Sequence, residues 1–168
     1  TTTKYAMCWN GDNQSLWSHL QASLPQVCSM GLSSFPLDGV DIGGFSCDTT
    51  EELLIRFIEA NMFSPFLRNH SAAGTIHQEP WCFSSKCIEV YRKMVNLRYK
   101  FIPYMYDLAY KAHKEGTPIL RPLFFNYPFD KNVKEINDEV MLGDSILLAP
   151  ILTQGARSRS IYLPQGTW

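Results

Sequence analysis

Apolar residues near the start of the chain follow first the pattern of a short strand and then that of one helix face. The apolar run Tyr5–Cys8 predicts the strand. From about Ser15 the apolar residues recur at steps of four and three, which predicts an amphipathic helix that Pro25 kinks and Gly31 ends. The residues expected on its buried face are Leu16, Leu20, Leu24 and Val27.

The same order of strand, loop and helix then repeats. The apolar run Phe35–Ile42 predicts a buried strand that ends at Asp41, followed by a glycine turn. Thr49, with Glu52 three residues later, predicts a capping box that opens a helix burying Leu53, Phe57 and Ala60. Such alternation is typical of parallel sheets with crossover helices, so we expect an α/β fold.

The middle of the chain combines an irregular segment with the longest helical pattern. Residues 62–83 show no periodicity, and a loop of this length usually lines a site. Ser84 and Ser85 open a helix that Gly116 ends, and Pro103 is expected to kink or split it. The stripe expected in its core is Ile88, Tyr91, Val95, Tyr99, Ile102, Met105, Leu108 and Ala112.

The last part of the chain predicts short antiparallel strands. A strand is expected over 119–125, where Pro122 disfavours an interior hydrogen-bonded position. Further strands are expected over 146–151 and 158–163. We therefore predict an α/β domain over 1–137 and the start of an all-β domain over 138–168. Two strands are too few for an independent sheet, so we expect the chain to be a piece of a longer protein.

Composition narrows the expected partners. The formal net charge is −1, which gives no electrostatic footprint for nucleic acid or an anionic membrane, so a neutral partner is expected. Aromatic residues make up 13% of the chain and suit either sugar stacking or an ordinary core. No apolar stretch reaches the length of a membrane span, and Thr1–Lys4 does not resemble a signal peptide. The five cysteines, an odd number without metal spacing, predict buried free thiols and favour the cytoplasm without fixing the compartment.

Two carboxylates follow predicted strands, which is where α/β folds carry catalytic groups. Asp12 lies in Trp9–Asn13 (WNGDN), and Asp41 precedes Gly43. From the residues alone, a turn or a helix cap is the favoured explanation of Asp12, and a turn competes with a catalytic role for Asp41. His70 and His77 lack a third metal ligand at suitable spacing, so we expect hydrogen-bonding histidines, with no metal and no cofactor.

Several short motifs occur in an order that resembles glycoside hydrolase family 31, the α-glucosidases and α-xylosidases. They are WNGDN (9–13), GVDIGGF (39–45), RNH (68–70), QEPW (78–81), LRY (97–99), PYMY (103–106), RPL (121–123) and LGD (142–144). The resemblance spans nearly the whole chain. It implies the C-terminal strands and helices of a (β/α)8 TIM barrel followed by the beginning of a β-sandwich domain.

The resemblance also implies a role for each matching residue. Asp12 matches the general acid/base of a retaining α-glucosidase, and a neighbouring indole would favour its protonated form by desolvation. The positions that match substrate-binding residues are Trp9 and Phe45 in the aromatic wall, Asp41 and His70 as hydrogen-bonding groups, and Arg68 in their support. The implied substrate is a neutral α-glucoside or oligosaccharide.

One half of the expected catalytic pair is absent from the sequence. A retaining glycosidase needs a second carboxylate as nucleophile, and the Trp-x-Asp-Met-Asn-like motif that carries it in this family does not occur. We therefore expect the nucleophile in an N-terminal remainder and an isolated chain without activity. The alternatives are a non-catalytic fragment that needs the remainder to fold or bind sugar, and a relative specific for α-xylosides or isomaltose. Asn10 and Asp38 depart from the family pattern, where Thr or Ser and an apolar residue are commoner.

Overall fold

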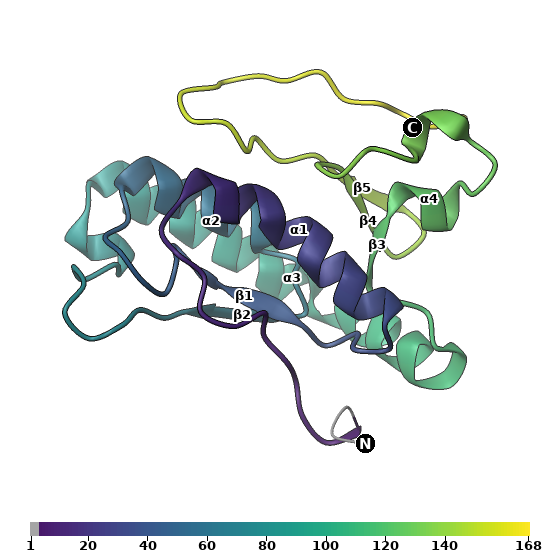
Figure 1. The fold of residues 1–168 in the computed structure, drawn as a ribbon, viewed down its shortest axis with the longest axis horizontal. Coiled ribbons are helices and arrows are strands. Elements are labelled where there is room, and N and C mark those ends of the chain that lie inside the picture. Colours follow the sequence, from purple (N-terminus) through teal and green to yellow (C-terminus); the bar gives the residue numbers. More distant parts are fainter. Residues whose placement is uncertain (1–3) are drawn as a thin grey trace.

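The first part of the molecule is a pair of parallel strands packed against three helices (Figure 1). The structure is a computed structural model that describes residues 4–168. Strands β1 (Gly39–Ile42) and β2 (Phe66–Asn69) pair in parallel. Helices α1 (Trp17–Leu32) and α2 (Glu51–Asn61) contact β1, and α3 (Ser85–Glu115) packs on α2. The parallel arrangement predicted from the alternation of elements is confirmed.

The segment expected to form the first strand lies beside β1 without becoming a strand. Cys8 N donates to Leu37 O at 2.9 Å, and Asn10 N donates to Gly39 O at 3.0 Å. The predicted strand at Tyr5–Cys8 is wrong: Tyr5 lies in a turn and is 81% exposed, and residues 6–8 have no regular secondary structure. The loop that carries Asp12 is nevertheless tied to the neighbouring strand by backbone hydrogen bonds.

Strand β1 begins at Gly39, four residues later than the apolar run predicts. Glycine is required there because a Cβ would lie 2.0 Å from the carbonyl oxygen of Phe66 on β2. The four residues of β1 are all buried, which agrees with the predicted buried strand. This close approach fixes Asp41 opposite Arg68 in the parallel register.

Helices α1 and α2 bury the predicted faces with small shifts at their ends. In α1, Leu20, Leu24 and Val27 are buried, whereas Leu16 precedes the first helical turn and is exposed. The helix contains Pro25 and continues past Gly31 to Leu32. In α2 the cap is Thr50 and not Thr49, since the Thr50 hydroxyl accepts from Leu53 N at 3.3 Å. The predicted face of Leu53, Phe57 and Ala60 is buried.

The segment 62–83 contains a strand that sequence periodicity does not show. β2 has only two apolar residues, Phe66 and Leu67, before the polar Arg68 and Asn69, so no alternation is visible. A short 3-10 helix, η2 (Pro80–Cys82), ends the segment. The expectation of a wholly irregular loop is therefore wrong.

Helix α3 begins and ends where the sequence indicates. The Ser84 hydroxyl accepts from Cys87 N at 3.4 Å, and Gly116 ends the helix with a φ of 74°. The helix includes Pro103 without being split. The expected core stripe is only partly buried: Met105, Leu108 and Ala112 are buried, but Tyr99 is 69% exposed and Ile102 is 47% exposed. The expected Tyr91 also packs against the core, and the inward face further includes Cys87, Met94, Leu97, Phe101 and Tyr104.

The C-terminal part contains a small antiparallel sheet with the order β3-β4-β5. Its strands are β3 (Leu120–Pro122), β4 (Val140–Leu142) and β5 (Ile146–Leu148), and the short helices α4 (Leu123–Asn126) and η3 (Lys131–Val133) precede β4. Pro122 lies on an edge strand of the described sheet, as its missing donor requires. The strand expected at 158–163 is wrong; this segment is irregular, with Ile161 and Leu163 about half exposed.

The two parts of the chain touch, because α1 contacts β3. The predicted boundary at 137/138 stays a prediction, and β3 before it shares a sheet with β4 and β5 after it. The main core combines α1, α2, α3 and β1 with parts of β3 and β4. A smaller cluster of Leu123, Val133 and Met141 lies on the other face of the C-terminal sheet.

The five cysteines are free thiols with different exposure. Cys28 and Cys87 are buried, and burial raises the pKa of Cys28 to about 12. Cys47 and Cys82 are exposed, so the expectation that the thiols are buried holds for part of the set. Within residues 4–168, no helix has both the length and the apolar character needed to cross a bilayer. The compartment stays a prediction.

Candidate active site

Asn13 joins the loop that carries Asp12 to the loop that follows β1. Its side-chain nitrogen donates to Asp41 O at 2.9 Å, and its side-chain oxygen accepts from Phe45 N at 2.9 Å. Its carbonyl oxygen accepts from Ser46 N at 3.0 Å. Sequence reasoning gave Asn13 no role, since its partners lie about thirty residues away and only the paired loops identify them.

The glycine turn after β1 allows the two loops to approach closely. Gly44 has a φ of 96°, and a Cβ on it would lie 2.3 Å from the backbone nitrogen of Ser15. A side chain is therefore excluded by conformation and by space. The glycine turn predicted after this strand is therefore required by the close approach of the two loops.

Asp41 and Arg68 form the central ion pair of the site. They are register partners on β1 and β2, so their side chains project on the same side of the strand pair. Arg68 Nε donates to Asp41 Oδ1, and Arg68 Nη2 donates to Asp41 Oδ2 at 3.1 Å. The Asp41 side chain is fully buried, whereas that of Arg68 remains 35% exposed. Arg68 is therefore the member of the pair that solvent reaches.

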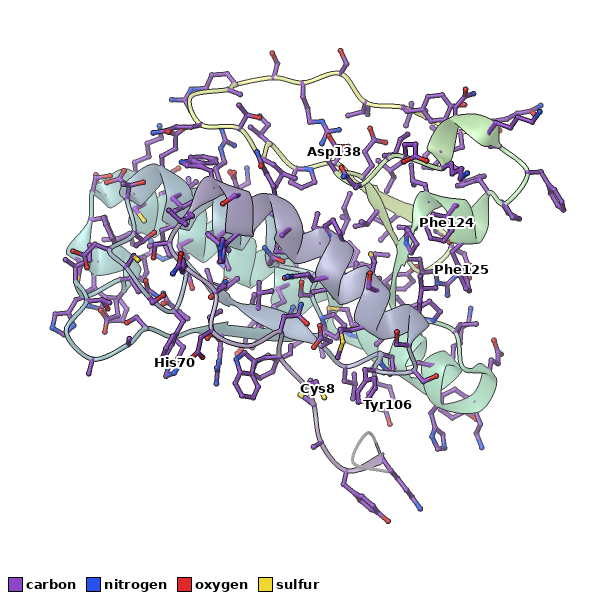
Figure 2. All side chains as sticks on the ribbon, viewed as in Figure 1. Cys8, His70, Tyr106, Phe124, Phe125 and Asp138 are labelled. Carbon is purple, nitrogen blue, oxygen red and sulfur yellow. The ribbon has the colours of Figure 1, made fainter. Side chains whose placement is uncertain are left out.

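Aromatic rings flank this ion pair. The guanidinium carbon of Arg68 lies 5.2 Å from the centre of the Trp9 ring and 5.5 Å from that of Phe66. The rings of Phe45 and His70 have centroids 5.2 Å apart at an interplanar angle of 32°. Figure 2 shows His70 on the side of the strand pair opposite α1. Trp9 thus lies against Arg68 of β2, and Phe45 lies against His70, which directly follows the same strand.

Asp12 lies at the exposed side of this group. Its carboxylate is solvent-exposed and has no hydrogen-bond partner among residues 4–168. The hydrogen bonds that Arg68 donates to Asp41 raise the pKa of Arg68 above its ordinary value, and the negative charge of Asp12 adds to this rise. Asp12 therefore interacts electrostatically with the same guanidinium that Asp41 holds.

The side chain of Gln78 holds the backbone of His70 in place. Its buried side-chain nitrogen donates to Ile42 O at 3.1 Å and to His70 O at 3.0 Å. Asn69 Nδ2 in turn donates to Gln78 O at 2.9 Å. A hollow of about 500 Å³ beside this network is lined by His70, Gln78, Trp81 and Tyr91, among others. The sequence gave Gln78 only as part of a motif, and its burial is the observation that reveals the support.

The histidines of the site region do not form a metal-binding set. His77 Nδ1 lies 3.7 Å from Glu79 Oε2, in an exposed pair. Over the described part of the chain, no three side chains of histidine, cysteine, aspartate or glutamate are grouped so that they could hold a metal ion.

Family models match both parts of the chain. The model described as glycosyl hydrolases family 31 TIM-barrel domain matches residues 1–108. The chain belongs to glycosyl hydrolase family 31. The model of the family 31 C-terminal domain matches residues 116–168. A barrel portion followed by a C-terminal domain agrees with the order predicted from the sequence.

Individual relatives support the same assignment. The chain is 44% identical over 165 residues to "Alpha-glucosidase 2" of Bacillus thermoamyloliquefaciens, which covers 98% of this chain and 21% of that protein. It is 39% identical to the mouse "Lysosomal alpha-glucosidase", covering 98% of this chain and 17% of that protein. The chain therefore spans about a fifth of the length of these family 31 relatives.

Solved structures of family 31 enzymes have the same fold. A Glc1Man2-bound glucosidase II alpha subunit superposes with a TM-score of 0.94 at 31% identity, covering 97% of this chain and 18% of that one. A soil-metagenome GH31 alpha-xylosidase complexed with xylose superposes with a TM-score of 0.87 at 31% identity, covering 94% and 27%. Family 31 relatives of this fold thus include both α-glucosidases and an α-xylosidase.

Proposed function

We propose that this chain is part of a retaining α-glucosidase that removes terminal α-linked glucose from oligosaccharides by double displacement. Asp12 is the general acid/base. The nucleophilic aspartate lies outside the chain, in the remainder of the protein, so the 168 residues alone do not turn over substrate. The proposed architecture is the C-terminal part of a (β/α)8 barrel followed by the beginning of a β-sandwich domain.

The contrast between the two carboxylates of the site carries this proposal. Both oxygens of Asp41 are engaged by Arg68, and its side chain is fully buried. Asp12 is exposed and makes no hydrogen bond within the described residues. A general acid/base must exchange a proton with the leaving oxygen and then with water. Of the two groups, only Asp12 has oxygens free to do so.

The surrounding residues suit a pyranose that occupies the space in front of the ion pair. Arg68 uses Nε and Nη2 on Asp41, which leaves its Nη1 donors available to a sugar hydroxyl. His70, stacked near Phe45, offers a further hydrogen bond. The faces of Trp9 and Phe45 provide apolar surface for the C–H groups of the ring. These four residues, with Asp41, are the proposed substrate-binding set.

α-Xylosidase activity is the second candidate. The xylose-complexed family 31 structure superposes on 94% of this chain, so the residues described are compatible with either sugar. Comparing kcat/KM for p-nitrophenyl α-glucoside and p-nitrophenyl α-xyloside with the full-length protein decides between them. A preference for the glucoside supports the proposal, and a preference for the xyloside replaces it with the second candidate.

Loss of Asp12 tests the assigned role. In the full-length protein, Asp12→Ala is expected to lower kcat/KM for maltose by about 10²–10⁴-fold, the usual contribution of general acid catalysis. Asp107→Ala, which removes an exposed carboxylate on α3, is the matched control and should stay near wild type. The wild-type protein should release glucose first as the α-anomer, measured by NMR. Full activity of Asp12→Ala, or initial release of the β-anomer, would refute the proposal.

A further inference from the structure

One exposed face of α3 carries a row of large apolar and aromatic side chains. Its members are spaced by three and four residues, and therefore lie on one face of the helix: Tyr99, Ile102, Tyr106 and Tyr110. We call these four residues the α3 stripe. Their exposed fractions run from 47% to 72%. A helix usually turns such a row towards a core, so this one lacks its partner among residues 4–168.

Charged residues in the same part of α3 follow a different face. Exposed and spaced by seven and four residues, they are Lys93, Lys100, Asp107 and Lys111. Charged side chains of this kind are the ones that a helix usually turns to water. Since α3 already has a charged face for the solvent, the α3 stripe is a second exposed face with the composition of a packing surface.

The α3 stripe lies on the flank of the helix away from the C-terminal sheet. Tyr104 OH donates to Leu142 O of β4 at 3.1 Å, which fixes the flank that faces this sheet. Residues two apart in a helix differ by about 200° in direction, so Tyr106 points to nearly the opposite side from Tyr104. Figure 2 shows Tyr106 on the side of the molecule away from Phe124, which follows β3. The C-terminal sheet described here therefore does not cover the stripe.

α3 runs beside β2, whose outer edge is also open. Arg98 Nη2 donates at 3.2 Å to Pro65 O, directly before this strand, and the α3 stripe begins with the residue after Arg98. Among the described residues, β2 pairs with β1 alone. Phe66 N donates to Asp38 O on the β1 side, so Leu67 N points to the outer edge, because these groups alternate along a strand. The open edge and the stripe therefore belong to neighbouring elements.

The occupant of this surface follows from what the described part of the barrel lacks. A closed barrel of this type has eight parallel strands, each paired on both edges, with helices packed outside. The described residues contain two paired parallel strands, although the family 31 TIM-barrel model matches residues 1–108. The chain spans 21% of one relative and 17% of another, so these longer proteins have ample further chain to supply the missing strands.

We propose that the α3 stripe and the open edge of β2 form one docking surface for the N-terminal remainder of the full-length protein. The remainder adds a parallel strand to β2 and lays the apolar face of a helix on the stripe. This inference rests on the barrel architecture proposed above and not on the catalytic role of Asp12. By holding the remainder against this chain, the docking surface also sets the position of the proposed nucleophile relative to Asp12.

Thiol labelling of the full-length protein tests whether the stripe is covered. Tyr106→Cys places a thiol in the stripe, and Lys100→Cys places one on the charged face of the same helix, both at positions exposed in this chain. Reaction with N-ethylmaleimide is followed by mass spectrometry of the separate peptides, which distinguishes these sites from the five native thiols. The thiol at position 106 should react at least about 100-fold more slowly than the thiol at position 100, and equally fast in urea.

Two outcomes of the labelling would contradict the proposal. Equal native rates at the two positions would mean that the stripe faces water in the full-length protein. Protection at position 106 that is lost on dilution would assign the surface to a second copy of the protein and not to the remainder.

Hydrogen exchange in the wild-type full-length protein tests the added strand without any substitution. The amide of Arg68 points towards β1 and serves as the paired reference. The amide of Leu67 should exchange within about tenfold of the rate of Arg68, because a strand of the remainder accepts from it. Exchange of Leu67 at the rate of an unstructured amide would overturn the inference. Neither measurement involves catalysis, so full activity of Asp12→Ala would refute the proposed function and leave the docking prediction standing.

Discussion

Two arginine–aspartate pairs in this molecule have the same chemistry and opposite exposure. In the parallel part, Asp41 is fully buried and Arg68 is 35% exposed. In the antiparallel part, Arg121 is 4% exposed and Asp144 is 58% exposed. Each guanidinium also lies near an aromatic ring, Trp9 at 5.2 Å and Phe125 at 5.3 Å. The parallel part thus exposes its arginine, the partner proposed to bind ligand, whereas the antiparallel part exposes its aspartate.

The inverted exposure has an energetic consequence. Removing the exposed partner of a buried charge leaves that charge without compensation, whereas removing the buried partner leaves an exposed charge that water solvates. The costly deletion is therefore the arginine in the parallel part and the aspartate in the antiparallel part. In the C-terminal sheet, Arg121 keeps a second contact, since its Nε donates to Pro118 O at 2.7 Å.

Arg68→Ala is expected to have the largest effect. It leaves the buried Asp41 carboxylate unpaired, which should lower the free energy of unfolding by about 3–5 kcal/mol. It also removes the donors proposed to bind the sugar, so kcat/KM should fall by about 10- to 100-fold. Urea unfolding and steady-state kinetics measure both quantities. If Arg68→Ala cost no more stability than Asp41→Ala, the proposed asymmetry would be wrong.

Asp38 adds a third case to the comparison of the two pairs, a buried carboxyl that no arginine contacts among the described residues. Asp38→Asn tests what this burial costs. Burial raises the pKa of Asp38 to about 6. The unfolded chain releases this proton near pH 4, so between about pH 4 and pH 6 the folded state binds more protons and stability falls as the pH rises. The resulting decrease in the free energy of unfolding persists at pH 7 and amounts to about 2–3 kcal/mol.

The neutral Asn removes this pH dependence. Thermal unfolding should show Asp38→Asn more stable than wild type at pH 7 and equal to it at pH 4. Ser23→Ala, a control that breaks the buried contact from Asn61 Nδ2, should stay parallel to wild type at both. A constant difference between Asp38→Asn and wild type across this range would contradict a titrating Asp38.

Asp144→Ala is expected to have a smaller effect in the C-terminal sheet. It leaves Arg121 buried, but the remaining bond to Pro118 O limits the loss of stability to about 1–2 kcal/mol. Lys111→Ala removes only an exposed contact of 3.7 Å to Asp144 and should cost less than about 1 kcal/mol. Both variants should keep kcat/KM near wild type. A loss of activity in Asp144→Ala as large as that in Arg68→Ala would erase the distinction between the two pairs.

Sequence reasoning succeeded where the physical signal is local. The prediction that the longest helix begins after Ser84 and ends at Gly116 is confirmed, because capping interactions involve residues that are close in sequence. β2 was missed because two apolar residues followed by Arg68 and Asn69 show no period. The exposed Tyr99 was placed in the core because a helix with aromatic residues on several faces does not show which face packs.

The sequence proposes the candidate site as a set of residues but not as an arrangement. The family resemblance supplied Asp12, Asp41 and Arg68, yet the pairing of Asp41 with Arg68 depends on the parallel register of β1 and β2. The bridging role of Asn13 depends on two loops that meet about thirty residues apart in sequence. Such contacts are set by tertiary packing, which no local pattern encodes.

Azide rescue of Asp12→Ala in the full-length protein tests the central assignment most directly. Azide needs no general base, so it can attack a glycosyl-enzyme intermediate that water attacks slowly in this variant. With p-nitrophenyl α-glucoside as donor, the account predicts faster turnover with added azide and an α-glucosyl azide product, identified by NMR. A β-glucosyl azide would mean that Asp12 is the nucleophile, and an unchanged rate without azide product would mean that it is neither.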